Sequence, residues 1–185
     1  DGHRIVHRQF DGQRRSIVVQ TPPCGYVWVP APSSDAPLPA ALKTPLAEEF
    51  VLRNEFLEVA ISDITGGIAQ LRTYRFGGNR LSQQLAWRFP REKTINSTTP
   101  EGDPVTRNTW YTDMRLRESR ILSAGPAYGA FETVGELIDP ANGQPLGTYR
   151  QTYHIWRGRP EVVVDVELGL QRTPEGDPWS NYVAS

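Results

Sequence analysis

The sequence predicts an all-β protein folded as an antiparallel β-sandwich. Sixteen prolines and sixteen glycines interrupt the 185 residues at short intervals, and no long stretch has the apolar spacing of a helix. Several short stretches instead alternate apolar and polar residues, a pattern that gives a strand one buried face and one solvated face. Turn residues separate these stretches, and a series of such strands is typical of a sandwich.

Three regions follow one another along the chain. Residues 1–30 are predicted to be the tail of a small β-domain, in which residues 17–19 and 26–29 form two strands joined by a tight turn. Residues 31–45 are rich in proline and alanine and are predicted to be an extended linker. Residues 46–185 are predicted to form the large sandwich domain. Because the chain does not begin with methionine, we expect it to be a fragment of a larger protein.

The first elements of the large domain are predicted to be a β-hairpin. Residues 50–61 alternate, with Leu57, Val59 and Ile61 on one face, and a glycine-bearing turn leads into a partner strand at 68–76. Residues 94–108 are polar and without pattern, which predicts a surface loop. Further strands are predicted at 114–122, 130–138, 147–156 and 161–170.

The last of these strands has the strictest alternation. Apolar side chains occupy every second position from Val162 to Leu170, with Glu161, Asp165 and Glu167 on the other face. This pattern predicts one buried and one solvated face. The chain is short for a complete large sandwich, so we expect a partial one with an exposed apolar edge, through which two copies could form a homodimer.

Composition excludes several classes of function. The net charge is −1, from 20 basic and 21 acidic residues, and no cluster of Lys and Arg is present that would displace counterions from a nucleic acid. No apolar run approaches the roughly 20 residues that a membrane-spanning helix needs. We therefore expect neither a nucleic acid nor a membrane as a partner. Cys24, the one cysteine, is predicted to be a buried thiol at a turn.

The sequence contains no pattern that we interpret as catalytic or as a metal site. His3 and His7 are four residues apart, too far along a strand to bind one metal ion together. Glu161, Asp165 and Glu167 could form a carboxylate pair of the kind that hydrolyses glycosides, but alternation alone explains them as a solvated strand face. No cofactor is predicted for this chain.

Carbohydrate contacts are the binding function that the sequence favours. Sugar rings have apolar faces that stack on aromatic side chains, while polar neighbours bind the hydroxyl groups. Two segments, 108–113 and 177–182, combine these residue types at predicted strand ends, and a histidine in strand 147–156 shares a face with an aromatic residue. The alternative is that the tryptophans close the ends of the sandwich and that the histidine is an ordinary strand residue. The candidates are Trp110, Tyr111, His154, Asp177, Trp179 and Tyr182.

Three segments in order give the chain a resemblance to a known family. The first runs from residue 1 through Val6-His7-Arg8-Gln9 to Pro22-Pro23-Cys24-Gly25-Tyr26-Val27. The second is 52–59, with Asn54-Glu55, followed by Thr65-Gly66-Gly67-Ile68, and the third runs from Tyr153 through Arg157-Gly158-Arg159-Pro160 to the valine-rich strand. Together they resemble the C-terminal β-sandwich region of glycoside hydrolase family 38, the α-mannosidases. The resemblance covers most of the chain.

The resemblance implies a fold, a partner and a function. The fold is a partial galactose-mutarotase-like supersandwich, preceded by the end of a smaller β-domain. In that family the zinc ligands and catalytic carboxylates belong to an N-terminal domain, so this chain would be a non-catalytic scaffold that packs against the catalytic domain and adds carbohydrate contacts. Two alternatives stay open: a free-standing carbohydrate-binding module, or a mutarotase-type enzyme that uses His154 with one of Glu161, Asp165 or Glu167.

Overall fold

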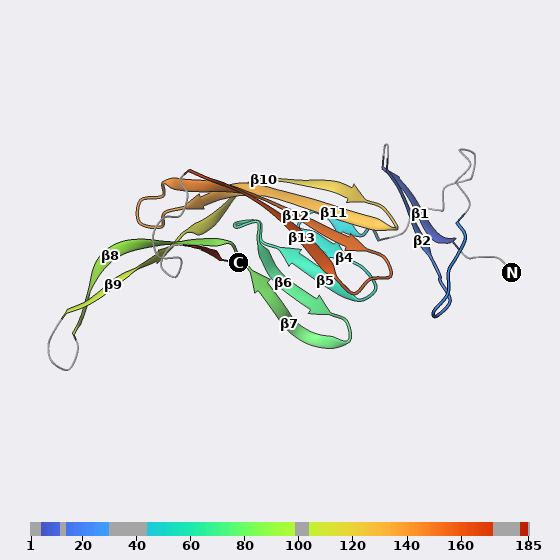
Figure 1. Ribbon diagram of the computed structural model, residues 1–185, viewed down its shortest axis with the longest axis horizontal. Helices are drawn as coiled ribbons and strands as arrows, with labels where there is room; N and C mark the ends of the chain where they lie inside the picture. The colour runs from blue at the N-terminus through green and yellow to red at the C-terminus, as the bar shows by residue number, and fades with distance from the viewer. Residues whose placement is uncertain (1–4, 12–13, 30–43, 99–103, 172–181, 185) are drawn as a thin grey trace.

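The computed structural model describes residues 5–11, 14–29, 44–98, 104–171 and 182–184 (Figure 1). Within these ranges all the regular secondary structure is β, and no helix occurs. All strand pairs are antiparallel, with long-range registers that run down whole strands. The predicted all-β class is confirmed. The predicted linker at 31–45 lies almost entirely outside the described residues.

Two larger sheets form a sandwich-type arrangement, one above the other in Figure 1. The five-stranded sheet has the order β3-β4-β5-β6-β7 and the four-stranded sheet the order β10-β11-β12-β13. The five strands of the first are β3 (Ala47–Glu48), β4 (Val51–Arg53), β5 (Leu57–Ile61), β6 (Ile68–Thr73) and β7 (Phe76–Gln83). The four strands of the second are β10 (Asp113–Ala124), β11 (Tyr128–Ile138), β12 (Pro145–Trp156) and β13 (Val162–Leu170).

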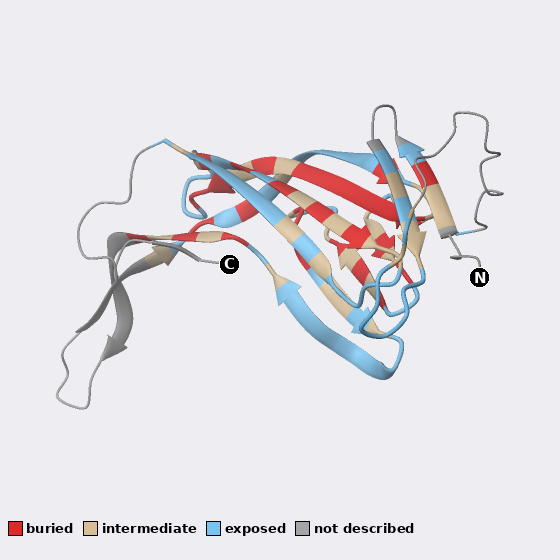
Figure 2. Cartoon of the chain, turned by 45° about the vertical axis from the view of Figure 1, so that its right-hand side comes forward, coloured by how far each residue is buried: buried red, intermediate tan, exposed pale blue. Residues whose placement is uncertain are grey.

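The core lies between these sheets because each contributes the apolar half of its alternating residues. In β5 the side chains of Leu57, Val59 and Ile61 are buried, as predicted, and they meet Phe131 and Ile155 from the opposite sheet. Figure 2 shows buried residues along the strands of both sheets. The four later strands are confirmed in place, and β5 and β6 form the predicted hairpin. The single strand expected over 50–61 is wrong, because the chain turns between residues 53 and 57 and forms two strands, β4 and β5, that pair with each other.

Two smaller sheets flank the sandwich. One is a hairpin of β1 (Ile5–Asp11) and β2 (Arg14–Val19), and the other contains β14 (Tyr182–Ala184), β8 (Ala86–Thr98) and β9 (Pro104–Tyr111). The base of β8 supplies a second apolar cluster at the far end of the four-stranded sheet. Its buried members are Leu85, Trp87, Phe89, Met114, Leu137 and Tyr149.

Three expectations for these regions are wrong. Residues 26–29 form no strand, and residues 17–19 pair instead with β1, which keeps the hairpin local. The expected loop at 94–108 consists largely of β8 and β9, because its threonines, isoleucine and valine favour extended backbone despite the polar composition. Cys24 does lie at a turn, with a φ of 56°, but it is exposed rather than buried.

The apolar face of β13 is covered only at its ends. Val162 and Val164 pack on the first core and Leu170 on the second cluster, but Val166 and Leu168 are 42% and 40% exposed. The prediction of one fully buried face is therefore wrong for the middle of this strand. No described strand lies beyond β13 in its sheet.

The turn between β5 and β6 joins the two sheets through hydrogen bonds in the interior. Tyr149 donates its hydroxyl to the Thr65 carbonyl at 2.6 Å, and Tyr153 and Thr133 donate theirs to the Gly66 carbonyl at 2.7 and 3.0 Å. Burial raises the pKa of both tyrosines well above the usual range, so both stay neutral donors. Each such bond contributes about 1 kcal/mol net, and a buried carbonyl left without one costs more.

The N-terminal hairpin is attached to the sandwich through one buried side chain. Gln9, 6% exposed, accepts hydrogen bonds from the backbone of Ala127 and Tyr128 at 3.0 and 2.8 Å and donates to the Ser123 hydroxyl at 2.5 Å. All three partners belong to the end of the β10–β11 hairpin. Burial and the nearby Arg157 guanidinium lower the pKa of His7, the residue two positions before Gln9.

Replacing Gly66 by alanine tests the interior turn. Gly66 has a φ of 72°, and an added Cβ would lie 2.7 Å from the Tyr149 hydroxyl and 3.1 Å from Thr133. We expect Gly66→Ala to lower the free energy of unfolding by about 3 kcal/mol in a denaturant titration. Gly143→Ala is the matched control, because Gly143 has a φ of 71° with open space around it. It should cost about 1 kcal/mol, and equal losses would contradict the role given to the turn.

Candidate functional site

The outer face of the four-stranded sheet carries a continuous set of polar and aromatic side chains. Strand alternation directs Tyr153 and Ile155 into the core and His154 outward. The registers place Ala130 and Val163 beside His154 on the neighbouring strands, so residues two positions away on β11 and β13 are its diagonal neighbours. These neighbours include Tyr128 and Asp165.

Tyr128, His154 and Asp165 form a hydrogen-bonded row across three strands. The Tyr128 hydroxyl lies 2.6 Å from His154 Nδ1, and His154 Nε2 lies 2.9 Å from Asp165 Oδ2. Tyr128 is buried, the His154 side chain is 17% exposed and the Asp165 side chain is 70% exposed. At one end of the row Tyr128 is therefore buried, and at the other end the Asp165 carboxylate is exposed to solvent.

The charge of the carboxylate determines the direction of both hydrogen bonds. An ionised Asp165 only accepts, so Nε2 of His154 carries its proton. In the neutral imidazole Nδ1 is then the acceptor, and Tyr128 donates to it. Each of the two ring nitrogens is thus in hydrogen-bond contact with a protein group.

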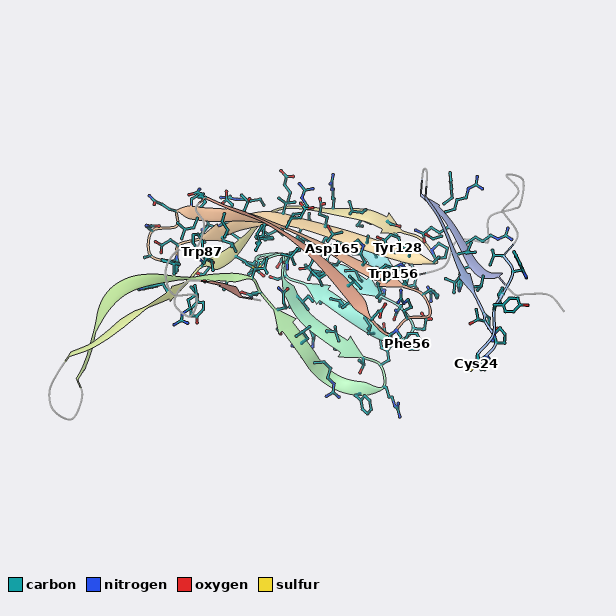
Figure 3. All side chains as sticks on the ribbon, viewed as in Figure 1. Cys24, Phe56, Trp87, Tyr128, Trp156 and Asp165 are labelled. Atoms are coloured by element: carbon teal, nitrogen blue, oxygen red, sulfur yellow. The ribbon has the colours of Figure 1, made fainter. Side chains whose placement is uncertain are left out.

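Aromatic rings surround this row at the end of the sheet. The Tyr128 and His154 rings stack with centroids 5.9 Å apart, and Trp156 lies 5.5 Å from the first and 5.9 Å from the second. The Arg159 guanidinium lies 5.5 Å from the Trp156 ring and pairs with Glu161 at 2.8 Å. Figure 3 labels Tyr128, Trp156 and Asp165 on their strands. We call Tyr128, His154, Trp156, Arg159 and Asp165 the outer-face cluster.

A ladder of ion pairs continues along the same face. Glu132, whose side chain is 7% exposed, contacts Arg120 at 2.7 Å and Arg150 at 3.3 Å. Arg150 also reaches Glu167 on β13 at 3.4 Å. The two guanidinium groups compensate the buried carboxylate, which would otherwise be costly to desolvate. This part of the face is internally neutralised, whereas the outer-face cluster ends in an exposed acid.

The residues predicted to contact carbohydrate lie on different sheets. His154 belongs to the outer-face cluster, together with Trp156, with which it was expected to share a face. Trp110, on β9, is partly buried against the second apolar cluster, and the adjacent Tyr111 is 46% exposed. Tyr182 begins β14, opposite Arg88 of β8, and its side chain is not described. Asp177 and Trp179 lie outside the described residues.

Three members of the cluster were not among the predicted candidates: Tyr128, Arg159 and Trp156, the last of which was only expected to share a face with His154. Tyr128 is 26 positions from His154, and only the β11–β12 register brings them together. Arg159 follows the Arg157-Gly158 turn, which folds its guanidinium back over Trp156. Asp165 was considered as a partner of His154 in the mutarotase-type alternative. In the β12–β13 register His154 lies opposite Val163, and Asp165 is two residues further along β13.

The side chains of the cluster can stack on a ligand, form hydrogen bonds with it and exchange protons. An aromatic ring, an imidazole, a guanidinium and a carboxylate at one strand end provide stacking and hydrogen bonds to hydroxyl groups. Among the described residues, no group of three His, Cys, Asp or Glu side chains could hold a metal ion. In the same residues no helix has the length and apolar character to cross a membrane.

Comparison of the whole chain with known proteins gives no relative. Protein-family models, curated proteins and solved structures give no match. The residues themselves are therefore the basis of the function proposed below.

The hydrogen-bonded row predicts one tautomer for His154. Long-range ¹H–¹⁵N NMR spectra should show the neutral form of His154 with its proton on Nε2, because Asp165 accepts there. In Asp165→Asn this preference should weaken, since an amide can also donate. Glu118→Gln, an exposed carboxylate on β10, is the control and should leave the spectrum unchanged. A proton on Nδ1 in the unmodified protein would contradict the assignment.

Proposed function

We propose that this chain is a β-sandwich scaffold module of a glycoside hydrolase that resembles the α-mannosidases of family 38. Its role is to hold a catalytic domain of the longer protein in place and to contribute carbohydrate contacts at its surface. The observation that carries the proposal is that the segments responsible for the resemblance bind one another and join the sheets.

Asn54 lies at the centre of the contact between two of these segments. It is 7% exposed, and its amide donates to the carbonyls of Trp156 and Arg159 at 2.8 and 2.7 Å. Its side-chain oxygen accepts from the backbone of Phe56 and Leu57 at 2.8 and 3.1 Å. One asparagine thus satisfies four hydrogen bonds and attaches the five-stranded sheet to the β12–β13 turn.

The neighbouring motif residues extend the same junction. Glu55 accepts from the Gly158 amide at 2.7 Å and from Arg157 at 3.5 Å, and Arg157 donates to the Pro126 carbonyl at 3.1 Å. Gln9, from the first segment of the resemblance, binds the end of the same β10–β11 hairpin. Side chains committed to such junctions stabilise a fold, and this use favours a scaffold over a reactive centre.

The full-length protein provides the test. We expect it to hydrolyse an aryl α-mannoside, and we expect Asn54→Ala to lower the free energy of unfolding by about 2–4 kcal/mol because buried carbonyls lose their donors. At a temperature where both proteins are folded, kcat/KM should stay within about twofold.

Asn142→Ala, at an exposed turn where Asn142 accepts from the Gln144 amide, is the control for stability and should change it little. Absence of mannosidase activity in the folded full-length protein would contradict the proposed family. A tenfold or larger fall of kcat/KM in folded Asn54→Ala would contradict the scaffold role.

A second candidate function is favoured by the outer-face cluster: direct carbohydrate binding, or mutarotase-type proton transfer to a sugar ring. The mutarotase hypothesis requires His154 and a β13 acid on one sheet face, and Asp165 lies 2.9 Å from His154 on that face. Opening a hemiacetal needs one group that removes a proton and another that donates one. Because both ring nitrogens of His154 are hydrogen-bonded to protein groups, the exposed Asp165 carboxylate would contact the sugar first, and His154 would act on it after one of these bonds opens.

Sugar titration of the folded chain distinguishes these functions. Mannose, galactose, glucose and mannobiose would be added while amide shifts and tryptophan fluorescence are followed. The second candidate predicts shifts at Trp156 and His154, and a mutarotation rate that falls about 10²-fold in Asp165→Asn but not in the control Glu118→Gln. Shifts without mutarotation would favour a binding module. No response at millimolar sugar would contradict the second candidate, and the scaffold function would stand as the remaining proposal.

A further inference from the structure

Two edge strands on the same side of the sandwich leave apolar side chains in solvent. β7 and β13 end their respective sheets, and Val162 and Val164 of β13 pack on the same core as Leu71 of β6, the neighbour of β7. Next to this contact, Leu81 of β7 is 46% exposed, as are Val166 and Leu168 of β13 at 42% and 40%. Figure 2 shows β7 exposed along almost its whole length.

The backbone of both strands is also available for pairing. Among the described residues, β7 pairs only with β6 and β13 only with β12, so one edge of each strand has no partner strand. Such an edge is a template for addition of another strand. On the opposite side of the sandwich, by contrast, β3 lies against β10 and β11.

The two edges carry charges of opposite sign. β13 contains Asp165 and Glu167, whose side chains are 70% and 78% exposed, and no basic residue. β7 contains Arg80 and no acid, and Arg75 immediately precedes it. Both guanidinium groups stack on the Phe76 ring, at 5.3 and 5.4 Å, and neither makes an ion pair with a carboxylate of the described residues.

This distribution selects one arrangement of two copies. A two-fold axis perpendicular to the sheets would place β13 against β13 and bring like charges together. A two-fold axis along the strands instead places β13 of each copy beside β7 of the other, so that acidic and basic edges meet twice. We propose that the chain forms this second, isologous dimer, in which each four-stranded sheet continues into the five-stranded sheet of the partner copy.

The dimer accounts for the apolar side chains that are exposed on the two edge strands. Leu81, Val166 and Leu168 lie on the inner faces of their strands, so joining the sheets extends the core across the interface and removes all three from water in each copy. The apolar contact supplies the affinity. The charges supply less of it, because exposed ion pairs contribute little, but they exclude the wrong pairing and make association sensitive to salt.

The association state of the folded chain tests the proposal by sedimentation equilibrium. We expect a concentration-dependent dimer, weaker at high salt. Leu81→Ser should raise the dimer dissociation constant about tenfold or more. Leu122→Ser is the matched control, since Leu122 is 44% exposed on β10 at the opposite side, and it should leave the constant unchanged. Circular dichroism melting would show that both variants fold.

A charge exchange tests the pairing of the edges. Arg80→Glu and Glu167→Lys should each weaken the dimer, and the double variant should recover most of the affinity. Arg150, which contacts Glu167, keeps Glu132 as a partner in these variants. Arg115→Glu, an exposed arginine on β10, is the control.

Three results would overturn the proposal. A monomer at all concentrations would show that another molecule, or none, covers this side. Equal effects of Leu81→Ser and Leu122→Ser would place the contact elsewhere. Failure of the double charge variant to recover any affinity would refute the pairing of β7 with β13. None of these outcomes depends on sugar binding or hydrolysis, so they leave the proposed function untouched.

Discussion

The hydrogen bonds from Tyr149, Tyr153 and Thr133 to the carbonyls of Thr65 and Gly66 are the constraint on which the rest of the structure depends. Apolar contact between two sheets is non-directional and would tolerate sliding. Buried hydroxyl groups and carbonyls tolerate no such shift, because each needs its partner within about 3 Å. This junction therefore sets how the five-stranded sheet lies against the four-stranded one, and it separates the two apolar clusters of the core.

The same relative position of the two sheets also brings together the hydrogen-bonding groups at the end of the sandwich. Asn54 and Glu55 meet the β12–β13 turn only because the sheets are held in register, and Gln9 then connects the N-terminal hairpin to the neighbouring turn. The outer face is organised differently. On it Glu132 pairs with two arginines across strands and His154 hydrogen-bonds to Asp165, so these side chains hold one another in place.

Much of the fold could be predicted, and the failures have physical reasons. The alternation at Leu57, Val59 and Ile61 indicated a buried face, since a period of two is the side-chain repeat of a strand. β8 and β9 were missed because polar β-branched residues favour strands without any apolar alternation. For the candidate site, His154 with Trp156 was predictable from their spacing within one strand. Tyr128 was not, since its position depends on the register between strands.

The sequence by itself determined the all-β class and the positions of the later strands, because local patterns are sufficient for these. Only the tertiary structure decided that the middle of β13 is left uncovered, that Asp165 lies against His154, and that acidic and basic edges lie on one side of the sandwich. These features depend on which strands become neighbours. Strand pairing joins residues distant in the chain, and no local pattern specifies it.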